Sequence, residues 1–191
     1  MQAKYNTAVI FAGGKSSRMG TDKALLPFGG HNSMAEYLCQ KLTKIFQNVY
    51  ISAKSDKFDF SPTVIIDNYE QSSPMVGLVS IFETIDYDEI FIISVDSPLI
   101  TQEIIDMLYK NASEHINADA IIATSPDGIE PMCGIYRRTI YPLAKKYLND
   151  DMHQLMKLLK NSTTEYLEFG SNKEFLNLNS PDQYEIAIAK Y

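Results

Sequence analysis

The chain has 191 residues, of which 45% are hydrophobic and 21% charged, a balance typical of a globular protein that buries a sizeable core. Its net charge of −7 at pH 7 argues against a general nucleic-acid-binding surface. Apolar runs such as residues 90–93 are too short to span a bilayer, and residues 1–9 lack the apolar segment of a secretory signal. We therefore expect a cytoplasmic protein that binds neither nucleic acid nor a membrane.

Neither the cysteines nor the composition gives any sign of a metal site or of a second domain. Cys39 and Cys133 are far apart and lack the spacing of a metal site, so we expect two small buried hydrophobic residues. The sequence contains no internal repeat, no low-complexity tract and no linker rich in proline and glycine. We therefore expect one domain over residues 1–191.

Short apolar runs alternate with segments of helical periodicity. Buried strands are expected at residues 8–11, 49–51, 64–66, 90–95 and 120–123. Helices are expected from Ser33 to about Phe46, after Pro74, after Thr101, at residues 140–148 and 155–159, and after Ser180. Residues 131–136 are expected to be an extended or edge segment. This rhythm predicts a three-layer α/β/α sandwich with a mostly parallel sheet.

The most informative segment is AVIFAGGKSSRMGTDKALLPFGG, residues 8–30, in which an apolar strand leads into a loop rich in glycines and cations. The glycines are Gly13, Gly14 and Gly20, and the cations are Lys15, Arg18 and Lys23. Glycines let a ligand approach the main chain, whose N–H groups can surround an anion, and the cations neutralise charge. The loop therefore favours a polyphosphate ligand over a surface turn that is basic by coincidence.

Two common nucleotide-binding motifs are excluded at this loop. The phosphate loop G-x-x-x-x-G-K-[ST] does not match, because Gly20 is followed by Thr21, Asp22 and Lys23. The dinucleotide fingerprint G-x-G-x-x-G is also absent. If this loop binds a nucleotide, it must do so through a different motif.

The segment FAGGKSSRMGTDKALL resembles the signature loop of the molybdenum cofactor guanylyltransferases, commonly L-A-G-G-x-S-x-R-M-G-x-D-K. Phe11 replaces the leucine, a change that should preserve the backbone contacts. The pairs Gly13-Gly14 and Asp22-Lys23 favour this guanine-specific branch over cytidylyltransferases and sugar-nucleotide enzymes. The resemblance implies a Rossmann-like sandwich of the nucleotide-diphospho-sugar transferase type. It also implies that Phe11, Ala12, Gly13 and Gly14 bind the nucleotide, and that Arg18 and Lys23 clamp its phosphates.

An acidic residue follows the most strand-like segment of the chain. Asp96 comes directly after residues 90–95, at the carboxyl edge of the predicted sheet, where ligands of open α/β sheets collect. IFIISVDSPLI resembles the family's strand followed by C-D-x-P, with Val95 in place of cysteine. The resemblance implies that Asp96 binds Mg²⁺ and takes part in catalysis. The alternative is a turn or capping aspartate ahead of Pro98.

Three further positions match the nucleotide side of the family pattern. Asp67 matches an aspartate that contacts the guanine nucleotide, although an ordinary turn residue explains it equally well. Gly77 matches the glycine of G-P-L-A-G, whose first position is here Ser73, and it serves either nucleotide approach or close helix packing. Ser52 stands where relatives often place asparagine, and its hydroxyl can retain one hydrogen bond.

The carboxyl-terminal segment FLNLNSPDQY resembles the family's F-x-N-x-N-T-P-E-D. Asn177 and Asn179 are two positions apart, so in extended backbone both side chains lie on one face. The resemblance implies a role on the pterin side of the active site. A pair of turn and capping asparagines is the alternative.

One stretch departs from the family pattern. Where relatives carry arginines that serve the molybdopterin phosphate, this chain has residues 151–154, Asp-Met-His-Gln. His153 can donate a hydrogen bond or simply be exposed. Arg137 and Arg138 are either basic contacts nearby or a solvated pair.

The function that the resemblance implies is transfer of GMP from GTP to molybdopterin or molybdenum cofactor, with release of pyrophosphate. Proteins that deliver the cofactor and a molybdoenzyme that receives the product are the implied partners. The alternatives are a nucleotidyltransferase of the same fold that uses CTP or a sugar phosphate, and a non-catalytic nucleotide-binding regulator.

Overall fold

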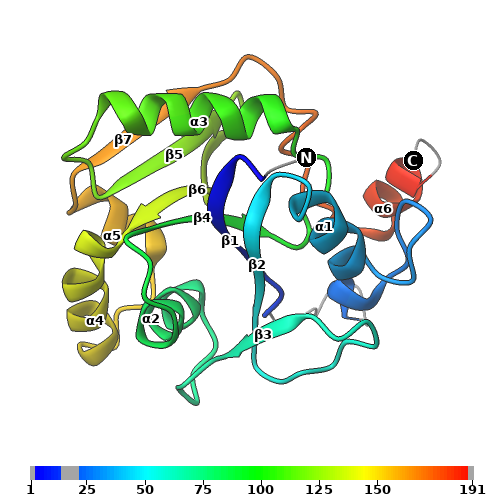
Figure 1. Cartoon of the computed structure of the whole chain (residues 1–191), viewed down its shortest axis with the longest axis horizontal. Coiled ribbons are helices and arrows are strands. Elements are labelled where there is room, and N and C mark those ends of the chain that lie inside the picture. Colours follow the sequence, from blue (N-terminus) through cyan, green and yellow to red (C-terminus); the bar gives the residue numbers. More distant parts are fainter. Residues whose placement is uncertain (1–2, 14–21, 189–191) are drawn as a thin grey trace.

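A seven-stranded sheet with helices on both faces forms the described part of the chain, residues 3–13 and 22–188 of a computed structural model (Figure 1). The strands are β1 (Tyr5–Phe11), β2 (Phe46–Ala53), β3 (Thr63–Ile66), β4 (Glu89–Ser94), β5 (Ala120–Ser125), β6 (Gly128–Arg137) and β7 (Thr164–Glu168). The α-helices are α1 (Met34–Leu42), α2 (Pro74–Thr84), α3 (Gln102–Glu114), α4 (Tyr141–Asn149), α5 (Leu155–Lys160) and α6 (Pro181–Ile188). Single turns of 3-10 helix are η1 (Lys23–Leu25) and η2 (Arg138–Ile140).

The sheet is mostly parallel, as the sequence predicts. Its strand order is β3-β2-β1-β4-β6-β5-β7, and only β6 runs antiparallel to its neighbours β4 and β5. Residues 131–136 are extended, as expected, but the alternative of an edge segment is wrong, because β6 pairs with β4 on one side and β5 on the other. Burial of residues 133–136 agrees with this interior position.

The edge strand on that side is β7, which the sequence analysis did not predict. Its residues, TEYLE, are all partly or fully exposed, so no apolar run marks them. Pairing with β5 gives this polar segment its extended conformation. Tertiary contact therefore decides the structure here.

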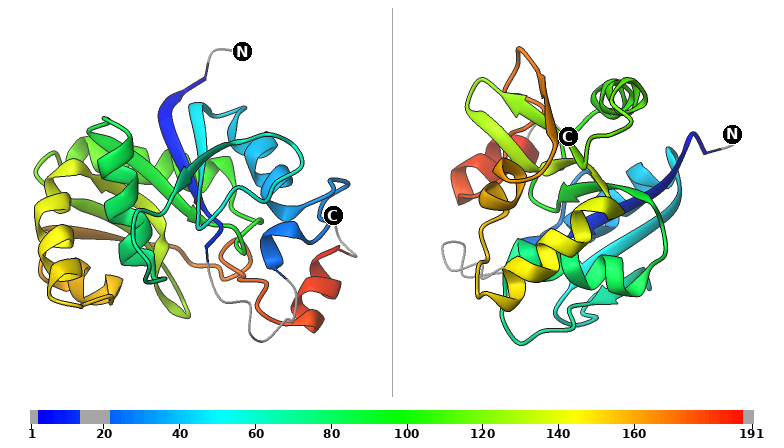
Figure 2. Two further views of the ribbon diagram at one scale, coloured as in Figure 1. Left: turned by 90° about the horizontal axis from the view of Figure 1, so that it is seen from below. Right: turned by 90° about the vertical axis from the view of Figure 1, so that its left-hand side faces the viewer.

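The helices form two layers, one on each face of the sheet (Figure 2). α1 and α3 bury their apolar sides with one face of β1 and β4, whereas α2, α4 and α5 pack on the other face. The architecture is a three-layer α/β/α sandwich. No helix among the described residues is long and apolar enough to cross a bilayer. The cytoplasmic location and the single domain stay predictions.

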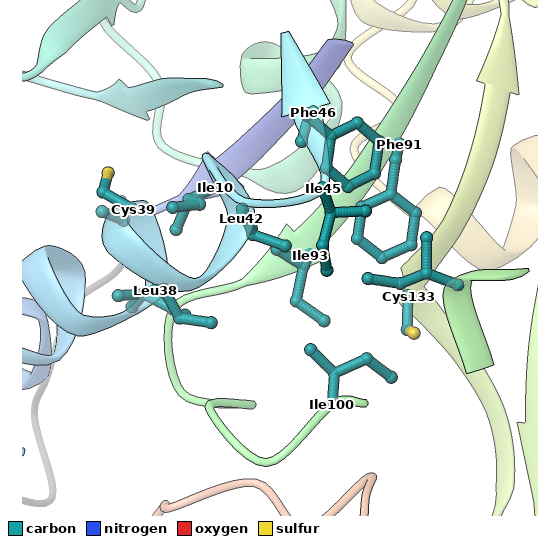
Figure 3. Close-up of a cluster of buried hydrophobic side chains, with 14 of the residues drawn as sticks. Ile10, Leu38, Cys39, Leu42, Ile45, Phe46, Phe91, Ile93, Ile100 and Cys133 are labelled. Carbon is teal, nitrogen blue, oxygen red and sulfur yellow. The ribbon is translucent and has the colours of Figure 1, made fainter. Parts of the chain in front are cut away.

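Both cysteines lie within the core, as expected. Cys39 on α1 and Cys133 on β6 are 9% and 4% exposed, and Figure 3 shows them among aliphatic and aromatic side chains. Both are free, and burial raises the pKa of the Cys39 thiol to about 12. They pack as small hydrophobic residues.

The first helix ends earlier than the sequence suggests. Ser33 caps it by accepting from the Glu36 N–H at 3.1 Å, and the Glu36 carboxylate accepts from the Asn32 N–H at 3.0 Å. The helix stops at Leu42, not near Phe46, because Phe46 already belongs to β2 and is paired with β1. At α3, Thr101 is the N-cap residue, but its hydroxyl makes no capping hydrogen bond.

Arg137 joins the end of α3 to the sheet. Its guanidinium donates to the carbonyls of Ala112, His115 and Ala118 at 2.8, 2.7 and 3.0 Å, and to Glu89 at 3.0 Å. These bonds satisfy carbonyls at a helix carboxyl terminus, where a cation is also favourable. Arg137 is therefore a structural residue.

Arg138 plays the same part at the end of α2. It donates to the carbonyls of Phe82 and Ile85 at 2.9 and 2.5 Å. The sequence left two alternatives for these arginines, basic contacts near the site or a solvated pair. The structure agrees with neither, because both side chains bind backbone carbonyls. The two arginines hold the ends of helices on opposite faces of the sheet.

We expect Arg137→Met to lower the free energy of unfolding by about 2 kcal/mol or more, because hydrogen bonds to a charged group contribute about 1.5–3 kcal/mol each. Lys110→Met, on the exposed side of α3, should change it by about 0.5 kcal/mol or less. Urea unfolding of the three proteins measures both values. Equal stability of the two variants would contradict the structural role.

Candidate functional site

The candidate site lies where four parallel strands end together. Phe11 at the end of β1 is in register with Ser52 of β2 and Ser94 of β4, and β3 ends beside β2. The chain then leaves the sheet: the Ala12 N–H donates to the Ser52 carbonyl at 2.9 Å, and the Val95 N–H donates to the Phe11 carbonyl at 3.0 Å. This is the carboxyl edge at which parallel α/β sheets bind ligands.

Lys23 and Asp96 meet at this edge. The Lys23 Nζ lies 3.0 Å from Asp96 Oδ2, although the two residues are 73 positions apart. Their side chains are 17% and 19% exposed, so the pair is reachable but partly shielded from water. The Ser94 hydroxyl donates to the other carboxylate oxygen, Oδ1, at 2.5 Å. The loop and the distant acidic strand end thus share one cleft.

The carboxyl-terminal asparagines complete this cluster. The Lys23 Nζ also donates to Asn179 Oδ1, and the Ser97 hydroxyl donates to Asn177 Oδ1 at 2.6 Å. Between them, the Leu178 N–H donates to the Asp96 carbonyl at 2.8 Å and its side chain is fully buried. The segment is therefore anchored against the Asp96 turn, with both asparagines on the side of the cleft.

Lys57 ties together the two ends of the glycine-rich loop. It donates to the Ala12 carbonyl at 3.1 Å and forms an ion pair with the Asp22 carboxylate. The other oxygen of Asp22 accepts from the Ala24 N–H at 3.0 Å and caps η1, which carries Lys23. The sequence analysis missed Lys57, since nothing in its polar loop distinguishes it from a surface lysine.

Two cavities open at this edge, and the larger, of about 600 Å³, lies over the ends of β1 to β3. Five of the predicted nucleotide-binding residues line it: Phe11, Gly13, Ser52, Asp67 and Gly77. Ala12 lies beside them, with its backbone N–H and carbonyl bound to Ser52 and Lys57. The predicted residues Gly14, Arg18 and the rest of residues 14–21 lie outside the described part of the chain.

Asp67 is one of two acidic residues that line the larger cavity, the other being Glu70. Its Oδ1 accepts from the Ser52 hydroxyl at 3.4 Å, and burial raises the pKa of the carboxyl. The nearby Lys54 and the Ser52 hydroxyl oppose that rise. A partly buried carboxylate with unused acceptor capacity is suited to N–H or hydroxyl donors of a ligand.

Gly77 allows α2 to pack closely against Phe11 of β1 and Ser52 of β2. A Cβ at this position would lie 2.5 Å from the Phe11 ring and 3.2 Å from the Ser52 hydroxyl, so no larger residue fits without displacing the cavity wall. The two alternatives for this glycine are therefore not exclusive. Close helix packing is what gives the cavity its shape.

The smaller cavity, of about 370 Å³, lies beside the end of β4. Asp96, Asn177 and Asn179 line it, together with Glu130 and Glu174, which the sequence analysis did not single out. Ser94 and Met132 line both cavities, so the two are adjacent. Ser94 also donates to Asp96, so the Lys23–Asp96 pair lies beside the wall that the two cavities share.

Two departures from the family pattern contact each other near the larger cavity. The Ser73 hydroxyl lies 3.0 Å from His153 Nδ1, and His153 Nε2 lies 2.9 Å from an Asp151 carboxylate oxygen. Ser73 is the N-cap of α2 and lines the larger cavity. His153 is thus held by two partners instead of being a purely solvated side chain.

Comparison with known proteins agrees with this architecture. The family model described as "MobA-like NTP transferase domain" matches residues 8–166. A molybdenum cofactor guanylyltransferase of Campylobacter jejuni is 37% identical over 97% of this chain and 96% of its own length. One from Helicobacter pylori is 32% identical over 94% of this chain and 90% of its own length.

Solved structures share the fold. Molybdopterin-guanine dinucleotide biosynthesis protein A from Archaeoglobus fulgidus superposes with a TM-score of 0.81 over 96% of this chain and 97% of its own, at 18% identity. A CMP:2-keto-3-deoxy-manno-octonic acid synthetase superposes with a TM-score of 0.78 at 14% identity, covering 98% of each chain. The fold is therefore that of nucleotidyltransferases of the nucleotide-diphospho-sugar transferase type. Within that class, the chain belongs to the MobA-like molybdenum cofactor guanylyltransferase family.

A partly buried lysine next to the site gives a pH-dependent prediction. Lys41 on α1 donates to the Pro98 carbonyl at 2.9 Å, just after the Asp96 turn, and burial lowers its pKa from 10.5 to about 8. The native state therefore binds fewer protons than the unfolded state between about pH 8 and 10.5. The cost of burying this charge is full below pH 8 and disappears as the pH rises to 10.5.

Lys41→Met removes that cost. Because solvent screens a charge that is only partly buried, the variant's free energy of unfolding relative to the wild type should fall by about 2 kcal/mol between pH 7 and 10.5, less than the full shift would give. Urea unfolding across this pH range measures the change. Lys44→Met, at an exposed position, should give a constant difference. A constant difference for Lys41→Met as well would contradict the burial of its charge.

Proposed function

We propose that the protein transfers GMP from GTP to the terminal phosphate of molybdopterin or molybdenum cofactor, and releases pyrophosphate. The observation that carries this proposal is the Lys23–Asp96 contact, which lies beside Ser94, a residue that lines both of two adjacent cavities. A donor nucleotide and an acceptor each need a cavity, and the transferred group must lie between them. The relationship to curated molybdenum cofactor guanylyltransferases supplies the identity of the two substrates.

The larger cavity is the proposed nucleotide site. The Asp67 carboxylate is placed to accept from the guanine N1–H and amino group or from ribose hydroxyls, with Ser52 orienting it. Gly13 lines the same cavity close to Asp67, because a Cβ built there would be 3.9 Å from the Asp67 carboxylate. Arg18, outside the described residues, and Lys23 would contact the phosphates from the loop.

Asp96 would hold the Mg²⁺ that the reaction uses. Among the described residues no group of three or more histidine, cysteine, aspartate or glutamate side chains is arranged as a metal site. A single carboxylate nevertheless fits Mg²⁺, which often takes one or two carboxylates and completes its shell with substrate phosphates and water. The bound ion would offset phosphate charge at the reacting centre. Lys23 balances the Asp96 charge in its absence.

The reaction needs no covalent intermediate with the protein. An oxygen of the acceptor phosphate forms a bond to the α-phosphorus, while the bond from that phosphorus to the β-phosphate bridging oxygen breaks and pyrophosphate leaves. The acceptor phosphate is already ionised near neutral pH, so a general base is unnecessary. Lys23 stabilises the developing charge, and Asn177 and Asn179 keep the acceptor side of the cleft in place.

We expect Asp96→Asn and Lys23→Met each to lower the rate of pyrophosphate release with GTP, Mg²⁺ and molybdopterin by about 100-fold or more, because each removes charge at the reacting centre. The exposed variants Asp59→Asn and Lys44→Met are matched controls that should keep wild-type rates. Thermal unfolding should show that all four variants are folded. Wild-type rates in both site variants would refute the assignment.

Nucleotide choice separates the proposal from the CTP-dependent and sugar-phosphate alternatives. With Mg²⁺ present, GTP should raise the melting temperature more than CTP, UTP or ATP at equal concentration, because a ligand stabilises the native state according to its affinity. A larger shift with CTP would favour a cytidylyltransferase. A GTP shift without pyrophosphate release in the presence of molybdopterin would favour a non-catalytic regulator.

A further inference from the structure

The smaller cavity is acidic, which is unexpected for a site that faces a phosphate-bearing substrate. Three carboxylates line it, from Asp96, Glu130 and Glu174, while Ile93, Ile100, Met132 and Phe175 supply apolar walls. The Asp96 carboxylate already accepts hydrogen bonds from Lys23 and Ser94. A ligand part that suits the remaining space must be flat or apolar on its faces and must donate hydrogen bonds from its edge.

Glu130 is held toward this cavity by the local backbone. The pairing of β5 with β6 shifts register between Ile122 and Ala123, so that Ile122 is opposite Gly134 but Ala123 is opposite Glu130. The intervening residues 131–133 form an irregularity of the kind that redirects side chains beside active sites. The Ser125 hydroxyl donates to Glu130 Oε1 at 2.8 Å and fixes the carboxylate plane.

The environment of Glu130 favours a ligand that donates hydrogen bonds. Burial raises the pKa of its carboxyl, and the nearby charge of Asp127 adds to the rise, while Ser125 opposes it. The ionised form is therefore poorly solvated in the cavity without further donors. Two N–H groups side by side on a ligand would supply them, since a carboxylate accepts such a pair in a bidentate way.

A pterin ring carries that pair of donors, the N3–H and the adjacent 2-amino group. We propose that Glu130 is the residue that recognises this edge of the acceptor, and so determines specificity for a 2-aminopteridine. The inference rests on the proposed function, because it takes the smaller cavity as the acceptor side. It assigns the ring to Glu130 and the phosphate to Lys23, which lies 3.0 Å from the Asp96 carboxylate in the cavity wall.

The test compares two ring systems, pterin and lumazine, in which lumazine has an oxygen where pterin has the 2-amino group. A carboxylate accepts from both donors of pterin but faces the C2 oxygen of lumazine with its own negative charge. We expect the wild-type chain to bind pterin at least about 10-fold more tightly, since a site built for a donor rejects an analogue that lacks it. Quenching of the intrinsic ring fluorescence during titration measures both affinities.

Glu130→Gln tests which residue sets this preference, because an amide can accept from N3–H and donate to the C2 oxygen of lumazine. We expect this variant to lose the preference for pterin or to reverse it. Glu103→Gln, at an exposed position of α3, is the matched control and should keep the preference. Glu174→Gln tests the other unassigned carboxylate of the cavity.

Unchanged preference in Glu130→Gln, loss of preference in Glu174→Gln instead, or failure of the wild type to prefer pterin would each overturn the inference. These outcomes are distinct from failure of the proposed function, which is read from pyrophosphate release and from the GTP-induced thermal shift. If the protein transfers GMP but its preference for pterin does not depend on Glu130, only this assignment is wrong.

Discussion

The contact between Lys23 and Asp96 is the constraint on which the site depends. A cation from the loop after β1 and a carboxylate from the end of β4 lie 3.0 Å apart, partly shielded from water. Each charge would be costly to bury without a partner, so each one holds the other in place. Under the proposed function, phosphates and a metal ion would become their new partners. Ser94 and Asn179 occupy further positions around the pair and limit its freedom.

This pair is supported by interactions that reach well into the fold. Lys57 fixes Asp22, Asp22 caps η1, and η1 presents Lys23. On the opposite side, Lys41 binds the carbonyl of Pro98 directly after the Asp96 turn. The site is therefore built from short local contacts, each anchored on an element whose position the buried sheet determines.

The sequence predicts those parts of the protein that local pattern controls. The apolar strands, the caps at Ser33 and Ser180 and the layer architecture follow from periodicity and from capping chemistry. The polar strand β7 and the interior position of β6 do not, because pairing with distant strands decides them. Within the site, the approach of Lys23 to Asp96 could be predicted from strand-end logic and from the family resemblance. Lys57 and Glu130 could not, since a lysine or glutamate in a polar stretch has no sequence signature until the fold gives it neighbours.

Charge explains how two anionic substrates can be oriented by a protein of net charge −7. Lys23 lies against Asp96 beside the wall that the cavities share, whereas Asp67 and Glu70 line the larger cavity and Glu130 and Glu174 line the smaller one. Under the proposed function, phosphates would be repelled from both acidic cavities and attracted to Lys23. Guanine and pterin have the opposite preference, since both present N–H donors that carboxylates accept. The same distribution of charge would therefore place both rings outward and both reacting phosphates together, which is the arrangement that nucleotidyl transfer requires.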